Sequence, residues 1–152
     1  MLNRTLCIVV RPECNTRLCI VVRPECNTWL EKAHRDLPVA EHEPKTKAPM
    51  TDIACFHAQQ AAEKSLKALL TGKGRIPPRT HGLEDLALIF AEHIQEAAAW
   101  PDQLVTLTPY AVSARDPEFP DPSREEARNA VTLARRVYRW ARKTLAEPGG
   151  NR

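Results

Sequence analysis

The chain has 152 residues, of which 43% are hydrophobic and 27% are charged, an ordinary balance for one globular domain. Its formal net charge of +3 is too small to identify a nucleic-acid-binding protein, so the position of the charges matters more. No apolar run approaches the roughly 20 residues that cross a bilayer, which argues against a membrane protein.

The five cysteines favour neither a disulfide framework nor a metal site. Four of them are copies, because residues 6–16 return identically as residues 18–28. Six residues separate the two cysteines of each copy, whereas zinc ligands are usually about two to four residues apart. The odd number of cysteines and the lack of a secretory pattern predict a reducing, cytoplasmic compartment. The cysteine spacing predicts no metal site, and we also expect no cofactor.

The repeat predicts an extension outside the fold, or a misplaced translation start. Solenoid repeats are longer and need at least about three copies to bury a core. Each copy here has a short apolar run and then Arg-Pro, which predicts a short strand followed by a turn. We therefore expect an irregular extension over residues 1–27, a helical domain over residues 28–147 and a disordered tail over residues 148–152.

Helical spacing of apolar residues begins at Trp29, where Thr28 and Glu31 fit a capping box. Pro38 predicts a kink or an early end of this first helix, followed by a polar loop over residues 41–50. The second helix is expected over residues 53–71, capped by Thr51 or Asp52. One side of it carries small and apolar residues that let a neighbouring helix approach closely: Ala54, Ala58, Ala61, Ala62, Ser65, Leu66 and Leu69.

A basic loop over residues 73–80 precedes a third helix, which we expect from Thr80 or His81 to about residue 96. A short fourth helix is expected over residues 101–114, followed by an acidic, proline-bearing loop. Ser123 and Glu126 fit a second capping box, which opens a last helix running to about residue 146. Seven basic side chains and two glutamates make this helix more positive than the whole chain.

Residues 52–70 read D-I-A-C-F-H-A-Q-Q-A-A-E-K-S-L-K-A-L-L and resemble the characteristic motif of HEPN domains. Residues 29–37, 78–83 and 110–117, and Glu126-Ala127 with the basic helix after it, resemble further family segments in the expected order. The resemblance covers about residues 28–146. It implies an all-α, up-and-down bundle of four or five helices, usually a homodimer. It also implies a gene beside a minimal nucleotidyltransferase, in toxin–antitoxin or nucleotide-handling modules.

Some members of this family are metal-independent ribonucleases in which a histidine follows an arginine after a few residues. The histidine acts as acid and base for attack by the 2′-hydroxyl group, and the arginine stabilises the charge on phosphorus. Arg115 matches the family arginine, but no histidine follows it in this chain. Arg115 and His81 are therefore candidate catalytic residues, although His81 is more simply explained as a helix-start residue making local hydrogen bonds.

Two groups of side chains are candidates for binding. On the second helix, a nucleotide or phosphate pocket would be formed by His57, Gln60, Lys64 and Lys67. Helix packing with pairs such as Glu63–Lys67 is the simpler interpretation of these residues, and we favour it. On the last helix, RNA phosphates or an acidic partner would be bound by Arg128, Arg135, Arg139 and Arg142, unless this is only a solvated face.

These features lead to one expected function and two alternatives. We expect a nucleotide- or RNA-binding or regulatory partner of a minimal nucleotidyltransferase, acting as a homodimer in a toxin–antitoxin-like module. The alternatives are a metal-independent RNA endonuclease toxin and a stand-alone nucleotide-binding helical dimer.

Overall fold

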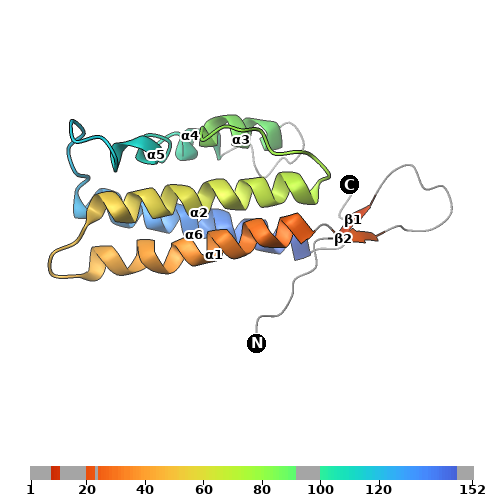
Figure 1. Cartoon of the computed structure of the whole chain (residues 1–152), viewed down its shortest axis with the longest axis horizontal. Coiled ribbons are helices and arrows are strands. Elements are labelled where there is room, and N and C mark those ends of the chain that lie inside the picture. The colour runs from red at the N-terminus through yellow and green to blue at the C-terminus, as the bar shows by residue number, and fades with distance from the viewer. Residues whose placement is uncertain (1–7, 11–19, 23, 92–99, 147–152) are drawn as a thin grey trace.

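Three long helices form the body of the protein in a computed structural model that describes residues 8–10, 20–22, 24–91 and 100–146. These helices are α1 (Pro24–His42), α2 (Thr51–Gly72) and α6 (Arg124–Ala146). Helix α2 packs against both α1 and α6, and the short helices α3, α4 and α5 follow its other side (Figure 1). The all-α bundle expected from the sequence is confirmed.

Helix α1 starts earlier and ends later than the sequence suggested. It begins at Pro24, a residue suited to the first helical position because it has no N–H to leave unbonded. The capping box at Thr28 and Glu31 is therefore wrong, and Cys26 already lies in the core with none of its surface exposed. Pro38 does not end the helix, which continues to His42 and then into the 3-10 turn η1 (Glu43–Lys45).

Helix α2 is the central element, and its predicted packing side is confirmed. Every member of the small-residue set is buried, with exposures of 0% or 1% for Ala54, Ala58, Ala61, Ala62, Ser65, Leu66 and Leu69. The predicted caps are wrong, because the N-cap residue is Met50 and its side chain makes no capping bond. After the helix, Gly74 has a φ of 77°, a conformation that suits a residue without a Cβ.

The third layer of the bundle departs most from expectation. Helix α3 (Leu83–Ala91) begins after His81, and the expected end near residue 96 lies outside the described residues. The single helix expected over residues 101–114 is wrong, because α4 (Pro101–Leu104) and α5 (Tyr110–Ser113) are separate and joined by turns. Pro109 explains the break, since it cannot donate the backbone hydrogen bond that would continue α4 into α5.

The two ends of the chain were expected to lie outside the bundle. The strands β1 (Ile8–Val10) and β2 (Ile20–Val22), one from each copy of the repeat, pair antiparallel with Ile8 opposite Val22. The strand expected in each copy is confirmed, so the extension is not irregular throughout. The boundary at residue 27 stays a prediction, and the tail over residues 148–152 lies outside the described residues.

Helix α6 confirms the predicted capping box. The backbone N–H of Glu126 donates to Ser123 Oγ at 3.1 Å, and the Ser123 N–H donates to Glu126 Oε2 at 2.7 Å. The apolar side of α6 faces α1 and α2, with Ala127, Ala134, Val137 and Ala141 fully buried. Within the described ranges, no helix combines the length and apolarity needed to cross a membrane.

Candidate functional site

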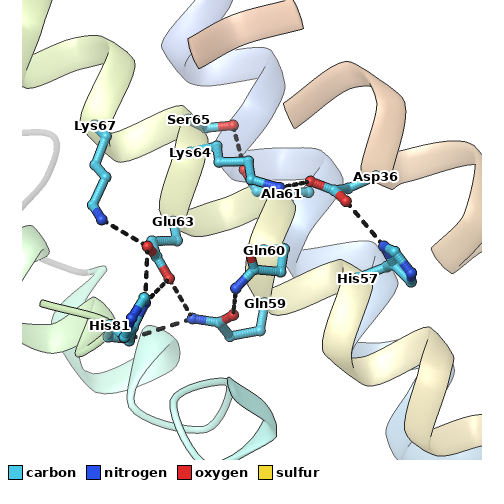
Figure 2. A network of polar contacts seen from close by, with 10 residues as sticks. All are labelled: Asp36, His57, Gln59, Gln60, Ala61, Glu63, Lys64, Ser65, Lys67 and His81. Carbon is cyan, nitrogen blue, oxygen red and sulfur yellow. Dashed lines mark hydrogen bonds and ion pairs between the residues drawn. The ribbon is translucent and has the colours of Figure 1, made fainter. Parts of the chain in front are cut away.

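A buried carboxylate, Glu63, organises the polar side of α2 (Figure 2). Lys67, one turn further along the helix, donates from Nζ to Glu63 Oε1 at 2.7 Å, and Gln59 Nε2 donates to Oε2 at 3.0 Å. His81 Nδ1 lies 3.1 Å from the same Oε2. Glu63 is 4% exposed and Lys67 is 7% exposed, so this ion pair is largely removed from water.

The surroundings of Glu63 keep it ionised despite its burial. Burial by itself raises the pKa of a carboxyl group, because it disfavours the charged form. The hydrogen bonds from Lys67, Gln59 and His81 outweigh this effect and hold the pKa of Glu63 below its ordinary 4.5. The charged form of Glu63 is thus the one that the fold is built around at neutral pH.

His81 connects the start of the third layer to α2. Its ring is 74% exposed and reaches Glu63, while its backbone oxygen accepts a hydrogen bond from Gln59 Nε2 at 3.3 Å. The expectation that His81 makes local hydrogen bonds is therefore wrong. Its two partners, Glu63 and Gln59, lie on α2. Its contacts fix the loop that enters α3.

A second polar cluster involves Asp36 of α1, which the sequence analysis did not single out. Asp36 Oδ1 lies 2.9 Å from His57 Nδ1, and Lys64 Nζ donates to Asp36 Oδ2 (Figure 2). Asp36 is 8% exposed and lies between Ala33 and Ala40 in the apolar pattern of α1. An acidic residue at a helix position predicted to be buried is the signal that would have identified it.

The predicted nucleotide pocket on α2 is occupied by contacts within the protein. Lys64 is paired with Asp36, Lys67 with Glu63, and Gln60 Nε2 donates to Gln59 Oε1 at 2.8 Å. A phosphate group that approached either ammonium group would compete with a carboxylate already bound there. The geometry favours the helix-packing interpretation, and nucleotide binding by His57, Gln60, Lys64 and Lys67 stays a prediction.

Arg115 and His81 contact different turns of α2. The guanidinium carbon of Arg115 lies 5.6 Å from the ring centroid of Phe56, whereas His81 contacts Glu63. Phe56 and Glu63 are about 10 Å apart along a helix that rises 1.5 Å per residue. Nothing in the described part of the chain joins the two candidate catalytic residues.

Near Arg115, the buried thiol of Cys55 faces Tyr110. Burial raises the pKa of Cys55 to about 12, although a hydrogen bond with Tyr110 opposes this shift. Burial also raises the pKa of Tyr110 to about 12. Because the thiolate is the reactive form of cysteine, the full burial and raised pKa of Cys55 favour a packing role.

Four arginines of α6 form a basic side of this helix. Arg128, Arg135, Arg139 and Arg142 are spaced by seven, four and three residues, which places them on one side of the helix. We call these four residues the arginine stripe. Arg135 Nε donates to Glu41 Oε1 at 2.8 Å, while the other three are exposed and make no salt bridge within the described residues.

The bundle and the motif helix α2 define a HEPN domain. The family model for the HEPN domain matches residues 26–144, and the chain belongs to this family. An archaeal HEPN homologue of known crystal structure is 24% identical, with a TM-score of 0.64 over 79% of this chain and 97% of that one. The crystal structure of TT1696 from Thermus thermophilus is 28% identical, with a TM-score of 0.63 over 80% of this chain and 98% of that one. No curated protein matches the chain.

Proposed function

We propose that this HEPN protein is a binding and regulatory partner of a minimal nucleotidyltransferase, and that it binds RNA phosphates through the arginine stripe of α6. Membership of the HEPN family supports the partnership, and a homodimer is the proposed assembly. The RNA part of the proposal depends on one observation, the exposure of three stripe arginines that have no carboxylate partner in the described structure.

The stripe has a length and a chemistry that suit a nucleic-acid backbone. Arg128 and Arg142 are about 21 Å apart along the helix at 1.5 Å per residue, a distance that covers several phosphates of one strand. Arginine presents a planar set of donors that matches phosphate geometry better than an ammonium group does. The only acidic residues of α6 are Glu125 and Glu126 in its first turn, so little on the helix opposes an anionic ligand.

The test is a comparison of two triple variants with the same change in net charge. The stripe variant combines Arg128→Ala, Arg139→Ala and Arg142→Ala. It should bind a single-stranded oligoribonucleotide roughly 100-fold more weakly than the wild type at low salt. The slope of log K against log salt should become shallower by about 2 units, because three phosphate contacts are lost. The control, called the loop variant, combines Lys73→Ala, Arg75→Ala and Arg79→Ala. These changes remove three exposed basic side chains from the loop before α3.

The outcomes distinguish three roles of the stripe: specific RNA binding, a general effect of net charge, and binding of an acidic protein. Loss of RNA binding in the stripe variant, with retention in the loop variant, supports the proposal. An equal loss in both variants would mean that only net charge matters, and the RNA proposal would be wrong. Tighter binding of poly-glutamate than of RNA at matched salt would show that the stripe serves an acidic protein partner instead. Separately, failure of the chain to co-purify with a nucleotidyltransferase encoded beside it would contradict the partnership.

RNA cleavage by the alternative, endonuclease mechanism is expected to be absent. Arg115 packs against Phe56, and no histidine follows Arg115 in the sequence, where the family mechanism places its acid–base residue. Purified protein incubated with a labelled oligoribonucleotide should leave it intact, and Arg115→Ala should behave identically. Cleavage that disappears in Arg115→Ala would establish the endonuclease in place of a purely binding role.

A further inference from the structure

A hollow between the α4–α5 segment and α6 has no role in the proposed backbone contacts. Its volume is about 620 Å³, within the range of about 300–1,000 Å³ that is typical of small-molecule sites. Leu107, Ala130 and Leu133 give it an apolar lining. Thr106, Asn129 and Thr132 add hydroxyl and amide groups, and Glu126 adds a carboxylate that can accept from the amino group of a base. This combination suits a planar ring that carries hydrogen-bonding groups on its edge.

Arg136 lines this hollow and contacts Trp100 next to it. Its guanidinium carbon lies 5.2 Å from the ring centroid of Trp100, and Nη1 donates to Gln103 Oε1 at 3.3 Å. Trp100 in turn stacks on Trp140, with ring centroids 5.8 Å apart and planes inclined by 27°. The guanidinium group thus lies next to a stacked pair of indole rings, and RNA-binding proteins use guanidinium planes to stack unpaired bases.

The hollow also lies beside the arginine stripe. Arg136 follows Arg135 in the sequence and is therefore turned by about 100° around α6, onto the next side of the helix. Thr132, which lines the hollow, is exposed between Arg128 and Arg135 along the same helix. A strand whose phosphates contact the stripe would have its bases within reach of the hollow.

We infer that the hollow between α4–α5 and α6 binds one unpaired base of an RNA strand, which stacks on the guanidinium plane of Arg136. The inference rests on the proposed function, because the stripe must bind the phosphates of the same strand. It makes the preferred ligand single-stranded RNA, since the bases of a duplex are stacked and paired and cannot enter a pocket.

The experiment compares two strands that differ only in their bases. Wild-type protein should bind a twelve-residue oligoadenylate roughly tenfold more tightly than an abasic strand of equal length, as expected for one stacked base. Arg136→Lys keeps the charge but removes the plane, so it should abolish this preference and leave the affinity for the abasic strand unchanged. Asn129→Leu should reduce the preference in part, and Arg75→Lys is the matched control that should retain it.

The possible results distinguish failure of the base site from failure of the proposed RNA binding by the arginine stripe. Binding of both strands with equal affinity by the wild type would overturn the base site and leave the arginine stripe intact. Retention of the preference in Arg136→Lys would also overturn it, because a base would then stack elsewhere. Absence of binding to either strand would overturn the RNA part of the proposed function and the base site together. Quenching of tryptophan fluorescence by oligoadenylate but not by the abasic strand would support stacking of a base next to Trp100.

Discussion

Replacing Glu63 with alanine should lower the free energy of unfolding by about 3–5 kcal/mol, the usual cost of removing one partner of a buried ion pair. Lys67 is 7% exposed and would keep a buried charge without its carboxylate, and Gln59 and His81 would each lose an acceptor. The ammonium group of Lys67 also lies 5.5 Å from the ring centroid of Trp29, but this cation–π contact replaces only part of the stabilisation that the carboxylate gives. Urea denaturation at neutral pH measures the change.

The matched control for this prediction is Glu125→Ala, which removes the same side chain from an exposed position in the first turn of α6. That change should stay within about 0.5 kcal/mol of the wild type, as is usual for surface substitutions. A Glu63→Ala loss no larger than the control loss would show that the network does not stabilise the fold.

The same carboxylate should give the protein a component of acid sensitivity. A carboxyl group whose pKa is lower in the folded state contributes stability above its unfolded pKa and loses that contribution as the pH falls. Glu63 has such a lowered pKa, so stability should decline as the pH drops below about 4.5. Glu63→Gln cannot titrate and should show a flatter stability profile over that acidic range.

Local sequence signals anticipated much of the helical framework. The small-residue pattern of α2 identified a buried side, because a helix with a fixed period presents the same residues to its neighbours wherever they lie. The capping box at Ser123 was also correct, because its two hydrogen bonds are made within a few residues. The similar pair Thr28 and Glu31 misled, because Pro24 already supplies a good first helical residue and the helix has begun before Thr28.

The polar networks were much harder to anticipate because their partners are distant in sequence. Asp36 meets His57 and Lys64 of another helix, and His81 reaches back to Glu63. Residue types at these positions predict that partners are needed, but only the packing of α1 and the α3 entry on α2 determines which ones. The contacts of Trp100 with Trp140 and Arg136 were hidden for the same reason, since Trp100 precedes α4 and its two partners lie on α6.

Truncating Leu69 to alanine should also be among the most damaging single changes, at about 3–4 kcal/mol. Leu69 is fully buried in α2, so the change removes apolar contacts and leaves a cavity that the surrounding helices fill only partly. Leu88→Ala in α3 is the same substitution at a side chain that is 53% exposed, and it should cost less than about 1 kcal/mol. Thermal unfolding should show a melting temperature lower by roughly 10 °C for Leu69→Ala. Below that transition, the RNA affinity proposed for the arginine stripe should equal that of the wild type, because the stripe lies outside the core. Similar losses of stability for both leucine variants would contradict the packing described for α2.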